Sequence, residues 1–342
     1  MNRFEWSSPS TVAAAQREPL ATTASRMAAH DASGGSSDAV LMAGGIDVVG
    51  LMKDRLLAPS RVVSLRGIAE LGRIEDRADG SLGIGANVTL AAIADDPRVR
   101  AHHRALADAA GRSASRELRA VATIGGNLLQ RPRCWYFRSP AFACARKGGG
   151  TCFAFRGDNR YHAIFDHHGC AMVHPSTPAT ALVALGAHVE LAGRSARRRL
   201  ALESFLIGTD QSVTRENDLE DAEILTHVVL PAPVAGRRSA HQRVGEVASF
   251  DWPLADVAAV LDFDASGACS RASIVLGAAA PTPHRAREAE RALAGRALSP
   301  DVAKDAARAA LAQAAPLSGN AYKVPIFEAI VARTILEAAG RA

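Results

Sequence analysis

Four of the five cysteines lie close together in the sequence. Cys134, Cys144, Cys152 and Cys170 fall within 37 residues, whereas Cys269 stands far from them in a turn that leads into a strand. Thiolates bind zinc and iron–sulfur clusters, and pairs of thiols form disulfides in oxidising compartments. The segment around the four cysteines is therefore a candidate metal centre, and Cys269 is interpreted as structural.

The spacing of the four cysteines discriminates between these alternatives. The gaps of nine, seven and seventeen residues differ from the C-x(2–4)-C pairs of a structural zinc site. Two disulfides are less needed in a chain long enough to bury a sizeable core. An iron–sulfur cluster tolerates irregular spacing where a loop folds around it. Spacing alone favours a cluster over zinc and leaves unrelated thiols as a third alternative.

Basic residues and glycines surround the four cysteines. Positive charge would offset a thiolate-ligated centre and lower thiolate pKa values, and the candidates are Arg131, Arg133, Arg138, Arg146 and Lys147. The run Gly148–Gly150 would let backbone amides approach the sulfur atoms. The nearby histidines at 162, 167 and 168 are interpreted as hydrogen-bonding neighbours, since four cysteines suffice as ligands.

Two Gly-Gly turns are candidates for holding a phosphate. Gly44 and Gly45 follow a short apolar strand (40–43) and precede a helix-like segment, VVGLMKDRL. Gly125 and Gly126 lie in ATIGGNL, shortly before Cys134. Exposed backbone amides and helix N-termini favour an anion. Neither turn has the G-x-G-x-x-G pattern of a Rossmann fold, so the sequence predicts a nucleotide-like site of another kind beside an electron carrier.

Length and composition exclude several classes of protein. A chain of 342 residues, 48% hydrophobic and 22% charged, is expected to form two or three domains with a real core. Lys and Arg total 40 against 35 Asp and Glu, without a dense basic block, so nucleic-acid binding is not expected. No apolar run reaches the roughly 18 residues that span a bilayer. The start, MNRFEWSSPS, lacks the apolar segment of a Sec signal.

The elements expected around these motifs change along the chain. HPSTP at 174–178 predicts the start of a helix over 179–186, with a hydroxyl N-cap. A strand is predicted to end near 231, and Pro-Ala-Pro marks a boundary at about 231–235. The remainder is predicted as strands followed by packed helices, namely strands at 242–248, 260–264 and 271–276 and helices at 253–259, 283–293, 300–313 and 322–339.

Seven segments in a fixed order carry a resemblance that covers nearly the whole chain. They are AGGIDVVGLMK (43–53), IGANVTLAAIA (84–94), ATIGGNLLQRPRC (122–134), HPSTPATALVALGAHVEL (174–191), LPAP (230–233), LGAAAPTPHRAREAE (276–290) and AYKVPIFEAIVARTILE (321–337). The set resembles the FAD-binding medium subunit of the xanthine dehydrogenase and carbon monoxide dehydrogenase family of molybdenum hydroxylases. With the cysteine segment, it is most similar to the flavin subunit of bacterial periplasmic aldehyde oxidoreductases, which carries an extra [4Fe-4S] cluster. The flavin subunit of 4-hydroxybenzoyl-CoA reductase is a more distant likeness.

The resemblance implies a fold and a domain division. The fold class would be α+β, with a two-subdomain FAD-binding domain of the vanillyl-alcohol-oxidase/MurB type. A C-terminal α+β domain of the CO dehydrogenase flavoprotein type would follow it. The resemblance places the FAD-binding domain at 1–230, with the cysteine-rich iron–sulfur insert at about 131–171, and the C-terminal domain at 231–342.

The resemblance also implies the site residues. The [4Fe-4S] ligands would be Cys134, Cys144, Cys152 and Cys170. The cofactor-binding set for FAD would comprise Leu41, Met42, Ala43, Gly44, Gly45, Ile46, Asp47, Ser113, Ala114, Thr123, Gly125, Gly126, Asn127, Leu129, Ser176, Thr177, Ile224, Leu225, Tyr322 and Lys323. Two positions depart from the family pattern: Thr177 stands where many relatives have an acid, and Ile46 where Thr or Asn is usual. Backbone amides still bind phosphate there, so FAD binding is expected to survive.

The function implied is electron transfer. In relatives, a molybdenum-cofactor large subunit hydroxylates the substrate, here an aldehyde, and a [2Fe-2S] small subunit passes the electrons to FAD, from which they leave to an external acceptor. The chain itself shows no nucleophile–base pair. Two alternatives stay open: a flavin-free scaffold with a structural zinc site, and a stand-alone FAD oxidase of the same fold. The expected location is the cytoplasm, or the periplasm by co-export with a signal-bearing partner.

Overall fold

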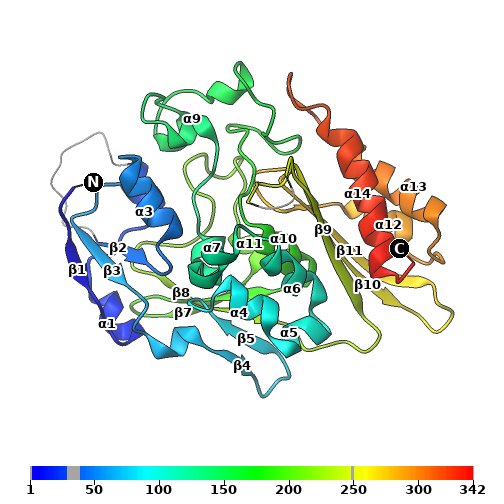
Figure 1. Ribbon diagram of the computed structural model, residues 1–342, viewed down its shortest axis with the longest axis horizontal. Coiled ribbons are helices and arrows are strands. Elements are labelled where there is room, and N and C mark those ends of the chain that lie inside the picture. The colour runs from blue at the N-terminus through cyan, green and yellow to red at the C-terminus, as the bar shows by residue number, and fades with distance from the viewer. Residues whose placement is uncertain (1, 29–38, 248–249, 342) are drawn as a thin grey trace.

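The N-terminal region forms a small parallel sheet with helices packed around it (Figure 1). The computed structural model describes residues 2–28, 39–247 and 250–341. The short apolar strands AVLM and RVVS are largely buried, as parallel strands generally are. Strand order is β1-β3-β2. The elements are β1 (Glu5–Ser7), α1 (Val12–Gln16), α2 (Thr23–Ala28), β2 (Ala39–Met42), α3 (Ile46–Lys53) and β3 (Arg61–Ser64).

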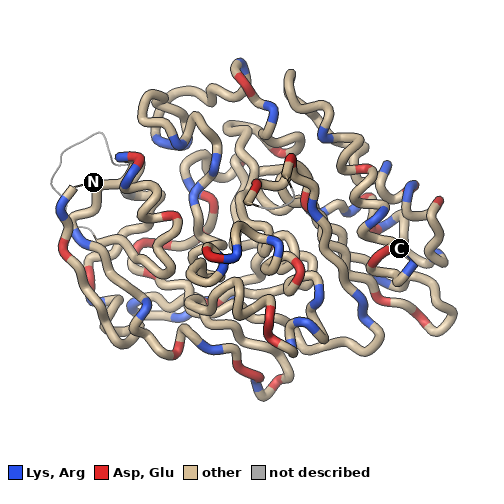
Figure 2. Tube along the Cα trace, in the orientation of Figure 1, with Lys and Arg blue, Asp and Glu red and all other residues tan. Residues whose placement is uncertain are grey.

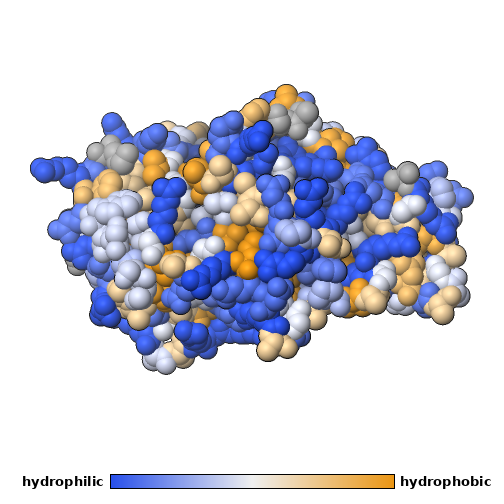
Figure 3. All heavy atoms as spheres, turned by 60° about the horizontal axis from the view of Figure 1, so that its bottom comes forward, coloured by the Kyte–Doolittle hydropathy of each residue, from blue (hydrophilic) through white to orange (hydrophobic). Residues whose placement is uncertain are grey.

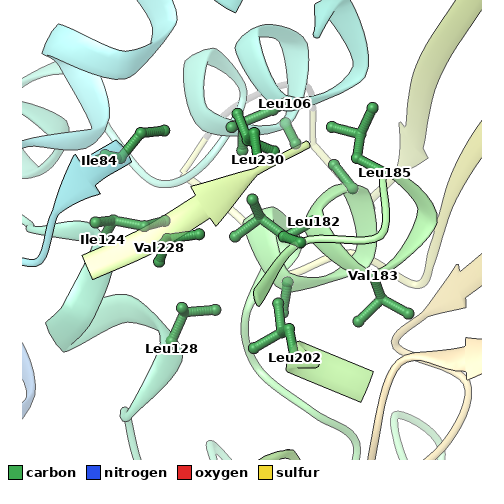
Figure 4. Packing of buried hydrophobic residues seen from close by; sticks show 14 of the residues in the cluster. Ile84, Leu106, Ile124, Leu128, Leu182, Val183, Leu185, Leu202, Val228 and Leu230 are labelled. Carbon is green, nitrogen blue, oxygen red and sulfur yellow. The ribbon is translucent and has the colours of Figure 1, made fainter. Parts of the chain in front are cut away.

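The middle region is a five-stranded antiparallel sheet in the order β4-β5-β8-β6-β7. Figure 4 shows Ile84 and Val228 of this sheet close to Ile124 and Leu128 of α8, with Leu182 of α10 nearby. The elements are a 3₁₀ turn (Ala69–Gly72), β4 (Ile74–Asp76), β5 (Leu82–Gly85), α4 (Leu90–Asp95), α5 (Pro97–His102), α6 (Arg104–Gly111), α7 (Arg116–Val121), α8 (Ile124–Leu128), α10 (Thr177–Ala184), β6 (His188–Ala192), β7 (Arg197–Ala201), α11 (Leu202–Phe205) and β8 (Ile224–Leu230).

The cysteine segment is mostly irregular and folds onto the N-terminal region. It contains α9 (Trp135–Arg138) and two 3₁₀ turns, Ala145–Lys147 and Phe153–Phe155. Phe137 and Cys144 are buried in one hydrophobic cluster with Leu51 and Met52 of α3. Apolar packing therefore anchors the segment to the N-terminal region.

The C-terminal region is an antiparallel sheet, ordered β12-β11-β10-β9, with α12, α13 and α14 packed on one side (Figure 1). The elements are β9 (Arg238–Val244), β10 (Ala255–Phe263), β11 (Cys269–Gly277), β12 (His284–Arg285), α12 (Arg287–Leu293), α13 (Pro300–Leu311) and α14 (Lys323–Ala338). Cys269 is fully buried at the start of β11, which agrees with its structural interpretation. The α+β fold class is confirmed.

One predicted element in this region is wrong. Of the helix expected over 253–259, residues 255–259 belong to strand β10, which pairs with β9 on one side and with β11 on the other, and residues 253–254 precede the strand. The run ADVAAVL is apolar except for Asp256 and is buried on both faces, and such a run has no periodicity that separates a buried strand from a buried helix. Pairing with two neighbouring strands decides the outcome.

The middle and C-terminal regions share one core. Ala258 and Val260 of β10 and Val275 of β11 belong to the same buried cluster as the residues of α10. Beside them, Asp256 binds His241 and accepts a hydrogen bond from Thr180 of α10 at 3.2 Å. This polar group is wholly buried, so it fixes how α10 sits against the C-terminal sheet.

Charged residues are spread along the whole chain, with basic and acidic positions interleaved (Figure 2). The face in Figure 3 is mainly hydrophilic, with small hydrophobic areas between the charged side chains. Of the helices within 2–28, 39–247 and 250–341, none combines the length and apolar character needed to cross a membrane.

Candidate functional site

The two glycine turns meet in space. A Cβ atom on Gly44 would lie 2.1 Å from the carbonyl oxygen of Val121, just before the second turn. Gly45 has φ of +81° and is the N-cap of α3. Only glycine allows this approach and this left-handed conformation without strain. Parallel strands β2 and β3 deliver the first turn at their carboxyl ends, where ligands bind in open α/β sheets.

The second turn is the start of a short helix rather than an open loop. Thr123 is the N-cap of α8, and its hydroxyl accepts from the Gly126 amide at 3.2 Å. The Gly125 amide donates to Ala86, and a Cβ on Gly125 would lie 2.8 Å from the Ala86 Cβ. The amides of this turn are therefore partly used inside the protein. The first-turn amides of α3 have no intrahelical acceptors, which makes them the better anion donors.

A cavity of about 160 Å³ opens between the two turns. We call it the nucleotide cavity. It is lined by thirteen of the residues predicted from the resemblance: Leu41, Ala43, Gly44, Gly45, Ile46, Asp47, Thr123, Gly125, Gly126, Asn127, Leu129, Ile224 and Leu225. Residues from β2, α3, α8 and β8, far apart in sequence, are thus brought to one place.

A second cavity of about 280 Å³ adjoins the first, and its lining includes Trp135, Tyr161 and Trp252. We call it the aromatic cavity. Arg133 lines both cavities, which makes it the residue at their junction. Thr177 at the first position of α10 also lines the aromatic cavity, as do residues of β10 and of the β11–β12 connection.

Arg133 is held in place but keeps an unused donor. Its guanidinium pairs with Asp47 at 2.9 Å, bonds the Gln130 side chain at 2.7 Å and lies over the Trp252 ring. Burial lowers the pKa of Arg133 to about 10, so the guanidinium remains charged at neutral pH. Its Nε atom is buried and has no partner among the described residues. An unpaired buried donor at this junction is suited to an anionic or carbonyl-bearing ligand.

His174 offers a second unused donor to the aromatic cavity. Burial lowers the pKa of His174 to about 4, so the ring is neutral at pH 7. Its Nδ1 atom accepts from the Ser176 amide at 3.3 Å, which places the ring proton on Nε2. Nε2 is buried without a partner in the described residues. His174 lines the aromatic cavity, so a ligand there would meet a fixed N–H donor.

The four clustered cysteines line a third, much smaller cavity of about 10 Å³. We call it the thiol cavity. Its other walls are mainly apolar, with Arg146 as the one cation, and include Tyr136, Phe137 and Met172. Cys134 lines both this cavity and the aromatic cavity. Loops that place cysteines with gaps of nine, seven and seventeen residues therefore converge on one space.

The thiols differ in their tendency to ionise. The pKa of Cys170 is lowered because Cys152 donates a hydrogen bond to its sulfur and Arg146 lies beside it, 3.4 Å from Nε to Sγ. The pKa of Cys152 is raised by the same pairing, and burial raises that of Cys134 to about 11. His162 Nε2 lies 3.2 Å from Cys134 Sγ.

No three His, Cys, Asp or Glu side chains within the described ranges are arranged to hold a metal ion. The four thiols therefore line one cavity without being arranged around a single metal ion.

Asp47 ties the thiol segment to the first glycine turn. Its carboxylate accepts from the Arg131 amide at 2.8 Å and from the Arg138 guanidinium at 2.6 Å, besides pairing with Arg133. The resemblance implied that Asp47 contacts a cofactor. Although it lines the nucleotide cavity, its oxygens are committed to the insert.

The remaining predicted residues lie outside the nucleotide and aromatic cavities. Met42 ends β2, Ser113 bonds the Ala109 carbonyl oxygen, and Ala114 lines a separate groove next to Arg119. Ser176 caps α10 and donates to the side chain of Asn127 at 2.6 Å, so it positions a residue that lines the nucleotide cavity.

Tyr322 and Lys323 also lie outside both cavities. Tyr322 is partly exposed and donates to the Arg160 carbonyl oxygen at 2.9 Å. Lys323 is 1% exposed, and its Nζ donates to the carbonyl oxygens of His162 (3.1 Å) and Ala278 (2.5 Å). His162 and Ala278 both line the aromatic cavity, so Lys323 holds their backbone in place through these hydrogen bonds.

Several lining residues were not found from the sequence. His174 was not named as a donor, and Arg133 was expected only as a positive charge beside the thiols. The walls that were missed include Leu20, Thr22, Gln130, Glu216, Asn217 and Leu219. His174 lies in the HPSTP motif, which was interpreted only as a helix start. Residues 216–219 belong to a loop without any recognisable pattern, so no sequence signal pointed to them.

The fold and these cavities define a class of protein, the FAD-binding medium subunits of the xanthine dehydrogenase and carbon monoxide dehydrogenase family. Residues 2–233 match the family described as FAD binding domain in molybdopterin dehydrogenase. Residues 243–338 match the CO dehydrogenase flavoprotein C-terminal domain. The chain belongs to this family, and its predicted class, an oxidoreductase subunit, is confirmed.

Among individual relatives, the chain is similar to the aldehyde oxidoreductase FAD-binding subunit PaoB of Escherichia coli (strain K12), with 31% identity over 89% of this chain and 92% of that protein. It is 28% identical to the carbon monoxide dehydrogenase medium chain of Hydrogenophaga pseudoflava, over 87% and 88% of the two chains. A solved structure of carbon monoxide dehydrogenase from Hydrogenophaga pseudoflava superimposes with a TM-score of 0.74 at 26% identity, covering 100% of this chain and 99% of that one.

Proposed function

We propose that this chain is the FAD- and [4Fe-4S]-containing electron-transfer subunit of a molybdenum-dependent aldehyde oxidoreductase. It would take electrons from a [2Fe-2S] small subunit, itself reduced by a molybdenum-cofactor large subunit, and pass them to an external acceptor. The observation that carries the proposal is the run of three cavities joined through Arg133 and Cys134, which are neighbours in the chain. The aldehyde is suggested by the similarity to an aldehyde oxidoreductase subunit.

The FAD would extend through the nucleotide cavity into the aromatic cavity. A glycine turn with free helix amides suits the pyrophosphate, and aromatic walls suit a flat ring. When bound, the flavin supplies the electron-transfer chemistry, and the protein orients it. This chain's part is to present fixed donors: Nε of Arg133 at the junction and the Nε2 proton of His174 at the aromatic end.

The thiol cavity is the proposed cluster site. In a four-iron cluster the four cysteines need not meet at one atom, because each thiolate binds a different iron. The cavity suits such a group because it combines four thiols, apolar walls and a buried guanidinium at Cys170. Arg146 Nη2 is buried without a partner among the described residues. Cys134, which also lines the aromatic cavity, would put the cluster next to the flavin ring.

The two alternatives make different demands on the same residues. A zinc-bearing scaffold without flavin would leave the unpaired donors of Arg133 and His174 unexplained. A stand-alone FAD oxidase would need the nucleotide and aromatic cavities but not a shared space for four thiols. The arrangement of all three cavities favours the electron-transfer subunit.

The test is the cofactor content of the chain purified without oxygen. We expect about one FAD and about four iron atoms per chain. Cys170→Ser should lose most of the iron and keep FAD, and the matched control Cys269→Ser, which changes a buried thiol outside the cavity, should keep both.

The same measurements separate the alternatives. Zinc in place of iron, without flavin, would support the scaffold. FAD without iron in the wild-type chain would support the oxidase. Co-expression with adjacent genes should recover the chain bound to a molybdenum subunit and a [2Fe-2S] subunit, and recovery of the monomer alone would contradict the proposed complex.

A further inference from the structure

A buried ion network stands behind the thiol cavity. The carboxylate of Glu216 pairs with Arg131 at 2.6 Å through one oxygen and with Arg146 at 2.5 Å through the other. All three side chains are at most 3% exposed. Arg131 is further held by the Thr214 carbonyl oxygen at 2.9 Å. Breaking such a buried group by removing one partner is costly, so the geometry is strongly specified.

The network carries more positive than negative charge. Two guanidinium groups face one carboxylate, and three guanidinium nitrogens, Nε and Nη2 of Arg131 and Nη2 of Arg146, have no partner in the described part of the chain. A net buried positive charge is unfavourable unless an anion lies nearby. Two candidates lie nearby. The Asp47 carboxylate accepts from the Arg131 backbone amide at 2.8 Å but already pairs with Arg133 and Arg138. The sulfur of Cys170 accepts from Arg146 Nε at 3.4 Å.

Arg146 connects the network to the thiols. Of the three residues in the network, it is the one that both pairs within the network and contacts a thiol. It lines the thiol cavity, while Glu216 lines the nucleotide cavity and Arg131 lines neither. The Glu216 carboxylate therefore fixes one edge of the Arg146 guanidinium, which turns Nε toward Cys170.

We propose that Arg146 is a positioning residue that sets the reduction potential of the group bound by the four thiols, and that Glu216 holds Arg146 in place and moderates its charge. This inference rests on the cluster in the proposed function. Hydrogen bonds to the sulfur ligands and nearby positive charge stabilise the more negative, reduced state of a cluster and raise its potential. Arg146 supplies both, and Glu216 partly cancels the charge.

The two residues should therefore act in opposite directions. Arg146→Gln removes the charge and weakens the bond to Cys170, so the potential should fall. Glu216→Gln removes the negative charge but keeps an oxygen that can accept from Arg146, so the potential should rise. A purely structural role would not give shifts of opposite sign.

The experiment is a potentiometric titration of the intact chain, followed by electron paramagnetic resonance. Each cluster takes up one electron from a mediator, and no thiolate bond is made or broken. Arg131→Gln is the matched control, because it removes an equally buried charge from Glu216 without contacting a thiol. It should shift the potential less than Arg146→Gln does.

Iron and FAD content are measured on every variant. The inference is overturned if Arg146→Gln and Glu216→Gln shift the reduction potential in the same direction. It is also overturned if Arg131→Gln shifts the reduction potential as much as Arg146→Gln does. If Arg146→Gln loses its iron, Arg146→Lys, which keeps the charge, must retain iron and Glu216→Gln must still raise the potential. A wild-type chain without iron would instead refute the proposed function.

Discussion

Close backbone approaches at single residues shape the nucleotide cavity. Gly44 lies against the Val121 carbonyl and Gly125 against Ala86, and neither place has room for a methyl group. The side chains that matter are buried polar groups with unused donors, such as Arg133 and His174. Single residues therefore specify the site in two ways. Gly44 and Gly125 leave no room for a side chain where two backbone segments meet, and Arg133 and His174 present unpaired hydrogen-bond donors.

Gly44→Ala tests the close approach. The added Cβ would overlap the Val121 carbonyl oxygen, so the two turns must separate. We expect a loss of roughly 1–3 kcal/mol in unfolding free energy and a several-fold weaker retention of FAD, measured by chemical denaturation and by flavin absorbance after dialysis. Gly72→Ala is the control, because nothing lies within 4 Å of a Cβ there. Equal effects of both changes would contradict the prediction.

Lys323 makes the stability of the protein depend on pH. Burial lowers its pKa to about 7 from an ordinary value of 10.5. The unfolded chain therefore binds more protons than the folded one between these values, and stability rises with pH across that window. This gain in stability is absent at and below pH 7 and complete above pH 10.5.

Lys323→Met removes this dependence. We expect the variant to have a higher free energy of unfolding than the wild type at pH 6–7. This difference should shrink by about 1.4 kcal/mol per pH unit above 7, because the wild type becomes more stable there. Unfolding midpoints at several pH values between 6 and 9.5 measure the slope. The carbonyl oxygens of His162 and Ala278 lose their donor in the variant, which changes its stability by the same amount at every pH. A stability difference between variant and wild type that does not change with pH would therefore refute the lowered pKa of Lys323.

Helix N-termini orient the elements around the cavities. Ser176 caps α10 by accepting from the Ala179 amide at 3.0 Å, and it also donates to Asn127 of α8. One hydroxyl therefore links the helix beside the aromatic cavity to the helix beside the nucleotide cavity. The cap is a local sequence feature, whereas the link to Asn127 exists only in the folded chain.

Ser176→Ala separates these two roles when it is compared with Ser299→Ala, which removes the N-cap of α13. Each change should cost about 1 kcal/mol of stability. Only Ser176→Ala should also weaken FAD retention, because Ser299 has no contact with the cavities. Calorimetry and the flavin content of the purified variants provide the two readouts. Unchanged flavin content in Ser176→Ala would refute the link.

On the scale of the whole molecule, the middle and C-terminal regions are joined by shared apolar core and by a buried polar group. The aromatic cavity takes walls from both regions, including Thr177 of α10 and Asp256 of β10. Its shape therefore depends on how the two regions dock. The Thr180–Asp256–His241 group lies at that contact.

Thr180→Val tests the docking contact while keeping the shape of the side chain. Asp256 would lose one donor, and a buried unsatisfied acceptor costs about 1–3 kcal/mol. Thr334→Val is the control, because its hydroxyl bonds only a carbonyl of its own helix at 2.6 Å. Thermal unfolding should show a clearly lower Tm for Thr180→Val alone, and equal losses would argue against a role in docking.

Local patterns in the sequence determined most elements, because they depend on neighbours in the chain. The strand–glycine–helix start at 40–53 and the capped helix opened by HPSTP were predictable in this way. The ordered motifs also sufficed to identify the family. Where periodicity was missing, as in ADVAAVL, the prediction was wrong, since pairing between strands decided it.

Only the tertiary structure decided which residues share a cavity. Glu216 meets Arg146 across 70 positions, and Lys323 meets the Ala278 carbonyl oxygen across 45. Long-range contacts of this kind leave no mark on local composition, because any loop that ends at the right place can supply them. For the same reason the cysteine spacing suggested a metal centre, while the convergence of the four thiols on one cavity next to Arg133 needed the folded chain.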